Sequence, residues 1–266
     1  MTSSIMLRLL SLLPIPALVV ITATLVLQGT KGVFDPFLLY PVLNILLVGI
    51  ATILSAYISA RSYLMSGSYT LLLLGGGALL YGSSTPLSNW LVYPPGGSNV
   101  AITVSNVGAL AASALFFVSA ALALAGVSLQ SSNPRKSTAM VVYLVLLVFV
   151  ASLAIVALQG VLPTFFIPGI GPTMLRQEVL ASAMILLALS SVLFMRLYYK
   201  SKAEILYWFS LAVALIVVGF SAWFLQHAVG DPLSWTGRIS QFLCGVYLLI
   251  GALTTVRAKQ TKETGP

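Results

Sequence analysis

The feature that most constrains this chain is a series of long apolar runs separated by short polar segments. A membrane-spanning helix needs about 20 mostly apolar residues. Eight runs reach that length: 9–28, 37–60, 68–92, 100–127, 138–159, 175–198, 203–228 and 238–256. None alternates with period two, which excludes a β-barrel. We therefore expect an all-α, polytopic transmembrane bundle of eight helices, or of seven if the first run is a cleaved signal peptide.

Composition excludes most other classes of protein. Apolar residues make up 59% of the chain and charged residues only 7%, against about 25% charged in an ordinary soluble domain. The chain has one cysteine, Cys244, and one histidine, His227. These single residues exclude an intramolecular disulfide and a cysteine cluster, and they exclude a bis-histidine haem unless a second chain contributes ligands, so we expect no metal and no cofactor.

The basic residues predict the orientation. With the N-terminus in the cytoplasm, three basic residues face outside: Lys31, Arg176 and Arg238. The other ten of the 13 lie inside: Arg8, Arg61, Arg135, Lys136, Arg196, Lys200, Lys202, Arg257, Lys259 and Lys262. This asymmetry follows the positive-inside rule and predicts a multi-pass protein of the cell membrane with both termini cytoplasmic.

The same pattern predicts one domain and its surroundings. Residues 1–257 form a single transmembrane helical domain, and 258–266 form a short basic cytoplasmic tail. The partner is the lipid bilayer, and a homodimer is an open alternative. The net charge of +8 does not indicate nucleic acid, because the charges stand singly between apolar runs. Arg257 and Lys259 are expected to anchor the last helix at the inner leaflet.

Groups that carry chemistry are scarce inside the apolar runs. No lysine is placed for a retinal Schiff base, and no Asp or Glu lies at mid-membrane, where ion pumps usually keep one. No zincin, nucleophile-elbow or kinase motif appears. We therefore expect no enzyme. The glycines at 75–77 are expected to allow close helix packing, with a ligand-contacting break in the helix as the alternative.

Polar and aromatic residues gather at the predicted outer ends of the helices. Arg176, Glu178, His227, Asp231 and Arg238 indicate either a structural ion-pair network, such as Asp231 or Glu178 with Arg238, or a polar pocket. The run 163–178, which contains two Pro-Gly turns, is expected to cover the bundle like a lid. The aromatics form an interfacial belt or roof a pocket. The candidate ligand-binding residues are Trp90, Asn106, Phe166, Glu178, His227, Asp231, Trp235 and Arg238.

Four segments, 56–82, 99–117, 163–183 and 230–253, resemble the N-terminal multi-helix membrane sensor region (MASE-type) of PAS-containing sensor histidine kinases. The likeness covers about residues 36–257. It implies that the last helix passes a signal to a fused PAS or kinase module or to a cytoplasmic signalling protein. The chain departs from the family pattern because no phosphoacceptor helix or ATP lid follows, so we expect no kinase activity in the chain itself.

Three functions follow as hypotheses. The first is a sensory input module of a two-component signal-transduction system, which binds a small ligand near the extracytoplasmic side and passes a helix shift inward. In that hypothesis Asp231 and Arg238 form the switch pair. The second is a structural anchor or scaffold subunit of a larger complex. The third is a transporter of a small solute, although no discontinuous helix pair is evident.

Overall fold

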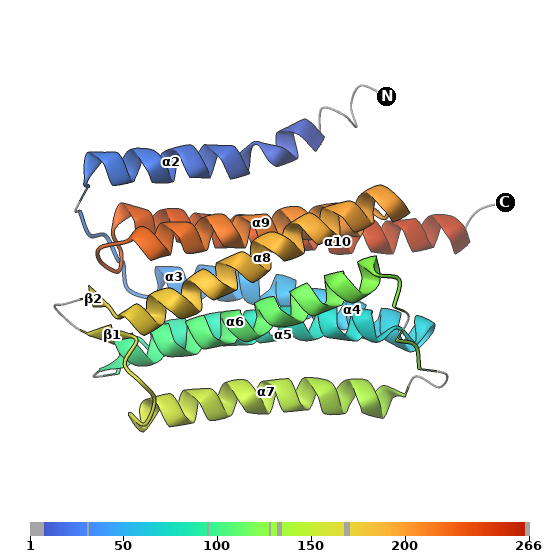
Figure 1. Ribbon diagram of the computed structural model, residues 1–266, viewed down its shortest axis with the longest axis horizontal. Coiled ribbons are helices and arrows are strands. Elements are labelled where there is room, and N and C mark those ends of the chain that lie inside the picture. Colours follow the sequence, from blue (N-terminus) through green and yellow to red (C-terminus); the bar gives the residue numbers. More distant parts are fainter. Residues whose placement is uncertain are drawn as a thin grey trace.

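The computed structural model describes residues 8–30, 32–94, 96–127, 129–131, 135–167 and 171–263, and the side chains from 255 onward fall outside this description. The side chains of the expected anchors Arg257 and Lys259 and residues 168–170 of the expected lid lie outside it. The described chain is almost entirely helical, as the apolar runs predict (Figure 1).

The helices follow one another with short connections. Their bounds are α2 Pro14–Gln28, α3 Leu39–Asn44, α4 Ile50–Ser66, α5 Tyr69–Trp90, α6 Gly97–Leu124, α7 Lys136–Leu158, α8 Met174–Ser201, α9 Glu204–Leu225 and α10 Pro232–Glu263. A π-helical segment, η1 Ile45–Gly49, joins α3 to α4 without a break. Two short strands, β1 Phe166–Ile167 and β2 Gly171–Pro172, pair antiparallel before α8.

Seven helices of the described chain are long and apolar enough to cross a membrane. The eighth expected span exists as the helix α5, but it falls outside that set. Its second half carries Ser83, Ser84, Thr85, Ser88 and Asn89, which lower its mean hydropathy. Most of α5 is buried by α4, α6 and α7, so this helix need not present an apolar surface to lipid.

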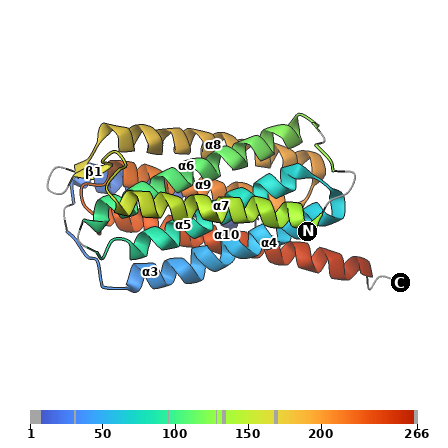
Figure 2. The same cartoon turned by 90° about the horizontal axis from the view of Figure 1, so that it is seen from below.

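Six helices form a closed ring. Around it, α4 contacts α5, α5 contacts α6, α6 contacts α8, α8 contacts α9, α9 contacts α10, and α10 returns to α4 and η1. Helix α2 packs outside the ring against α9 and α10 (Figure 1), and α7 packs outside against α5 and α6 (Figures 1 and 2). The core of the bundle combines aliphatic side chains with aromatic contacts, in which the ring of Phe209 meets those of both Phe116 and Phe194 edge to face.

Small residues allow the ring to close tightly. Helix α5 runs through its glycines without interruption, and a Cβ at Gly77 would overlap the ring of Phe116 on α6. A Cβ at Gly245 on α10 would overlap the backbone carbonyl of Leu47 in η1. The expectation of close packing at the glycine run is confirmed, and no break in the helix is found there.

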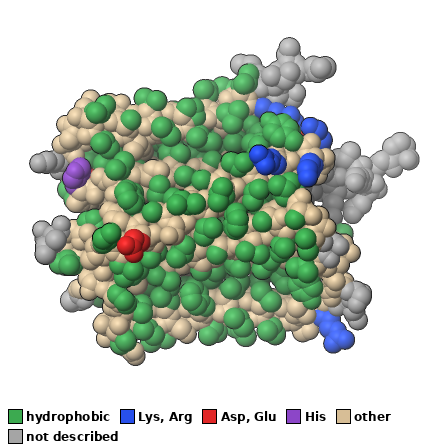
Figure 3. All heavy atoms as spheres, in the orientation of Figure 1, with side chains coloured by type: hydrophobic (Ala, Val, Ile, Leu, Met, Phe, Trp, Pro, Cys, Tyr) green, Lys and Arg blue, Asp and Glu red, His purple; other side chains and the backbone are tan. Residues whose placement is uncertain are grey.

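The outer faces indicate a lipid environment. Leu144, Val145 and Val148 of α7 are all more than half exposed in the isolated chain. A helix that is apolar on its outer face is suited to hydrocarbon, and apolar side chains cover the helices along their length (Figure 3). These observations support a multi-pass membrane protein.

The two ends of the bundle differ in charge. Lys and Arg side chains gather where α8 ends and α9 begins, the basic end (Figure 3). There Arg8 pairs with Glu204 at 2.6 Å. The opposite end, where α9 ends and α10 begins, contains a cavity between the helices and is called the cavity end. The first and last described residues both lie at the basic end (Figure 1).

Helix α10 differs from its expected bounds of 238–256. It begins six residues earlier, at Pro232, and continues to Glu263. Proline is favoured at the first position of a helix, and Asp231 before it accepts a hydrogen bond from the backbone N–H of Ser234 at 2.6 Å, as an N-cap does. Arg238 therefore lies in the second turn of a helix that starts at the cavity end.

Candidate functional site

A cavity of about 220 Å³ opens at the cavity end, between α3, α5, α6, α8, α9 and α10. Its apolar wall includes Phe37, Tyr40, Val92, Tyr93, Ile102 and Trp223. Its polar wall includes Thr85, Ser88, Asn89, Ser98, Ser105, Asn106, Gln226 and Ser234. Of the charged residues that the structure describes, Asp35, Arg176 and Arg238 line it. Such a combination of apolar walls with a few polar groups is typical of small-molecule sites.

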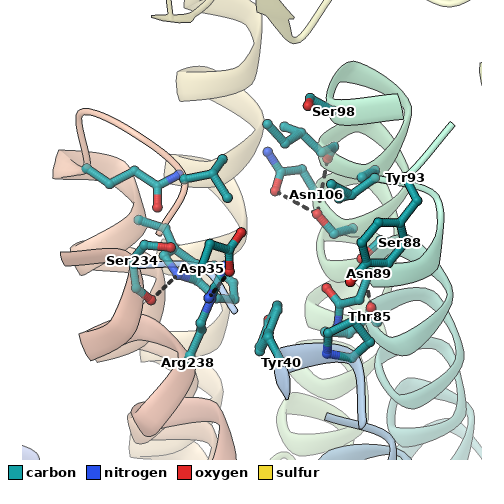
Figure 4. Close-up of a pocket in the computed structure, with 18 of the residues that line it drawn as sticks. Asp35, Tyr40, Thr85, Ser88, Asn89, Tyr93, Ser98, Asn106, Ser234 and Arg238 are labelled. Atoms are coloured by element: carbon teal, nitrogen blue, oxygen red, sulfur yellow. Dashed lines mark hydrogen bonds and ion pairs between the residues drawn. The ribbon is translucent and has the colours of Figure 1, made fainter. Parts of the chain in front are cut away.

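Arg238 is the most closely held of the charged residues. Its Nη1 lies 2.6 Å from Oδ1 of Asp35, and its guanidinium lies over the rings of Tyr40 at 4.2 Å and Trp235 at 4.7 Å. The side chain of Arg238 is only 4% exposed, whereas that of Asp35 is 39% exposed. The ion pair therefore joins the interior of the bundle to the rim of the cavity (Figure 4).

The expected pairing of Arg238 with Asp231 is wrong. Asp231 is buried, but its oxygens accept hydrogen bonds from the backbone N–H groups of His227, Ala228 and Ser234. These bonds hold the carboxylate at the start of α10, where the positive end of the helix dipole also favours it. Asp231 does not line the cavity and serves as a structural cap.

Arg176 is the second buried arginine. It lies in the first turn of α8, is 3% exposed, and has no carboxylate within ion-pair distance among the described residues. Its Nη2 donates to the backbone carbonyl of Trp223 at 3.3 Å, near the end of α9, while its Nε has no partner. A buried cation usually requires a counter-charge, so Arg176 is under-compensated.

A buried hydrogen-bond network lies beneath the cavity. The Oε1 of Gln241 accepts from the hydroxyl of Tyr40 at 2.8 Å and from Nδ2 of Asn44 at 3.1 Å. Its Nε2 donates to the hydroxyl of Tyr81 at 2.6 Å. The network joins α3, α5 and α10, and Gln241 lies one turn after Arg238. Cavity lining and bundle core are therefore connected through one face of α10.

Several cavity-lining side chains have a buried polar atom without a hydrogen bond: Nδ2 of Asn89, Nδ2 of Asn106, Nε of Arg176 and Oε1 of Gln226. A buried donor or acceptor left unpaired costs roughly 1–3 kcal/mol. A concentration of such atoms around one cavity indicates a place where a polar ligand or water completes the bonding.

Two of the eight candidate residues, Asn106 and Arg238, line the cavity. Trp90 lies outside it and contacts the lining residue Tyr93 at 6.4 Å between ring centroids. Trp235 lies beneath the guanidinium of Arg238 and donates from Nε1 to the carbonyl of Phe34 at 2.5 Å. These two aromatics support the wall from outside.

The remaining candidates do not reach the cavity. Glu178 and His227 are exposed, and Phe166 lies in β1. The backbone N–H of Phe166 donates to Oδ1 of Asn99 at the start of α6. None of the described residues of the expected lid, apart from Arg176 in α8, lines the cavity.

Sequence reasoning missed Asp35 and the role of Tyr40. Asp35 precedes Pro36 in the connection between α2 and α3, 203 residues from its partner Arg238. Tyr40 resembles an interfacial aromatic, but it forms one wall of the cavity together with Arg238 (Figure 4). The sequence does contain a signal for Asp35, because it is the sole acidic residue between the first two apolar runs, 9–28 and 37–60.

Among the described residues, no group of three or more His, Cys, Asp or Glu side chains could hold a metal ion. Comparison of the chain with protein-family models, with curated proteins and with solved structures found no match. The likeness to the membrane sensor regions of histidine kinases therefore rests on the sequence segments alone.

Proposed function

We propose that the protein is a membrane-embedded sensory input module that binds a small ligand in the cavity between α3, α5, α6, α8, α9 and α10. The basic end faces the cytoplasm, as the positive-inside rule requires, so the cavity opens on the other side. Signal passes through α10 to a cytoplasmic signalling protein or to a fused PAS or kinase module.

The observation that carries this proposal is the course of α10. The helix lines the cavity near its start with Ser234 and Arg238 and continues to Glu263, past residue 256, where its apolar run ends. At 1.5 Å per residue, the seven residues from 257 to 263 add roughly 10 Å of helix. One rigid element therefore contacts the cavity at one end and leaves the bundle at the other (Figure 2).

The contacts of α10 supply a means of coupling. A ligand that approaches Arg238 competes with Asp35 for the guanidinium, and Arg238 lies one turn from Gln241, which binds α3 and α5. A ligand shifts a conformational equilibrium only if it binds one arrangement better than the other. The exchangeable pairing of Arg238 provides that difference.

The first test is ligand retention. The full chain is purified in mild detergent and examined by native mass spectrometry and by a thermal-stability screen of small acids, amides, amines and sugars. We expect a bound or stabilising compound whose effect is lost in Asn106→Leu. Exposed Glu178→Gln is the matched control and retains the effect. A chain that binds nothing, but copurifies with stoichiometric membrane or enzyme subunits, would refute the sensory proposal and support the scaffold.

The second test is helix movement. Spin labels at Tyr199→Cys on α8 and Leu253→Cys on α10, both more than half exposed, report the distance at the basic end in a Cys244→Ala background. The compound found in the screen should shift this distance, and Arg238→Gln should abolish the shift. Binding without any shift would indicate a protein that holds its ligand without signalling.

A further inference from the structure

We infer that the ligand is a small monocarboxylate with an apolar body, bound through Arg176 and Arg238. This inference rests on the proposed function, because it names the class of compound that the same cavity takes.

The charges around the cavity indicate a ligand with a single negative charge. Two buried arginines line it, and one of them, Arg238, is paired with Asp35. Asp231 is buried nearby, but three backbone N–H groups occupy its oxygens and it does not line the cavity. One positive charge, that of Arg176, is left without a counter-ion among the described residues. A ligand with a single negative charge balances it, whereas a doubly charged phosphate exceeds it.

The unpaired hydrogen-bonding groups of the cavity indicate a ligand that accepts hydrogen bonds. Arg176 uses one donor, to the carbonyl of Trp223, and its Nε is unpaired. The Nδ2 donors of Asn89 and Asn106 are also unpaired, and the terminal torsion of an Asn side chain turns easily. Arginine presents two parallel N–H groups that match the two oxygens of a carboxylate. Among the described residues that line the cavity, these three unpaired donors outnumber the one unpaired acceptor, Oε1 of Gln226, as expected for an acceptor-rich ligand.

The apolar walls of the cavity indicate that the ligand has an apolar body. Phe37, Val92, Ile102 and Trp223 surround the polar groups. These side chains suit an aliphatic chain or an aromatic ring attached to the carboxylate, rather than a fully hydrated ion. The bilayer and the aqueous phase can both supply such a compound, because fatty acids and soluble organic acids share this chemistry.

The alternative use of Arg176 is to cap the end of α9 through Trp223. Its neighbour Gln177 makes the same kind of contact, from Nε2 to the carbonyl of Phe224 at 3.4 Å, but does not line the cavity. Gln177→Ala therefore removes a cap at the same helix end without touching the cavity, and it is the matched control.

The experiment measures binding of matched probes to the full chain in nanodiscs by isothermal titration calorimetry. The probes are hexanoate and benzoate, their neutral amides hexanamide and benzamide, the amines hexylamine and benzylamine, and the longer laurate. We expect the acids to bind at least tenfold more tightly than the amides, with no binding of the amines. Binding of laurate alone among the acids indicates a lipid source, and binding of hexanoate or benzoate a soluble one. Both results support the carboxylate class.

The variants separate charge from packing. Arg176→Gln should remove the preference for acid over amide, Arg176→Lys should keep the preference with weaker binding, and Gln177→Ala should leave it unchanged. Amides that bind as tightly as acids, with a loss in Asn106→Leu, would overturn the carboxylate inference and leave the binding function intact. If no probe and no compound of the stability screen bound, both proposals would fail.

Discussion

Replacement of Gln241 by leucine should destabilise the bundle by about 2 kcal/mol, although leucine suits a buried position in a membrane protein. The side chain of Gln241 is fully buried and makes three interhelical hydrogen bonds, to Tyr40, Asn44 and Tyr81. Interhelical bonds in membrane proteins average about 0.6 kcal/mol each, so three of them give roughly that total. The hydroxyl of Tyr81 loses its side-chain partner, which opposes any gain from the added apolar surface.

The assay is reversible unfolding by SDS titration of the protein in mixed micelles, followed by far-ultraviolet circular dichroism. Thr236→Val is the matched control on the same helix, because buried Thr236 bonds only to the carbonyl of Pro232 within α10. This control should change the free energy of unfolding by less than about 0.5 kcal/mol.

A double-mutant cycle isolates the bond between Gln241 and Tyr81. Tyr81→Phe combined with Gln241→Leu should cost less than the sum of the single changes, because the orphaned hydroxyl is gone. The reasoning is refuted if Gln241→Leu is as stable as the parent chain, or if the two changes add without coupling.

Three further predictions concern helix packing, the N-cap of α10 and the orientation of the protein in the membrane. Gly245→Ala should lower stability by about 1–3 kcal/mol through overlap with the carbonyl of Leu47, and an unchanged thermal unfolding midpoint would contradict this close approach. Asp231→Ala should cost about 1 kcal/mol through loss of the N-cap while probe affinity stays unchanged; reduced affinity at full stability would place Asp231 in the site after all. In intact cells of a Cys244→Ala strain, an impermeant maleimide should label His227→Cys and spare Lys200→Cys, and the reverse pattern would invert the proposed orientation.

The helices were predictable from the sequence because a membrane-spanning helix is recognised by its mean hydropathy over about 20 residues, to which any single residue contributes little. All eight expected runs are helical. Their ends were less predictable, since polar caps carry the boundary information. Asp231 and Pro232 mark the start of α10 by their chemistry, whereas the apolar run suggests Arg238. The π-helical turn at Ile45–Gly49 has no signature in hydropathy.

The site was predictable only in part, because its contacts join distant segments. Placing Arg176, Asn106 and Arg238 at one end of the bundle follows from alternating helix direction. The ion-pair partner of Arg238 does not follow in the same way, since Asp231 is near Arg238 in sequence and Asp35 is 203 residues away. Backbone N–H groups at a helix start compete for Asp231, and that competition decides the pairing.

The π-helical turn has a consequence for the phase of the helix that contains it. Such a turn accommodates one more residue than an α-helical turn, and each residue advances an α-helix by about 100°. Deletion of a single residue between Ile45 and Gly49 would therefore rotate Tyr40 and Asn44 away from Gln241 while everything after Ile50 stayed in register. The alignment of the cavity wall with the bundle core depends on the count of residues in this turn as much as on their identity.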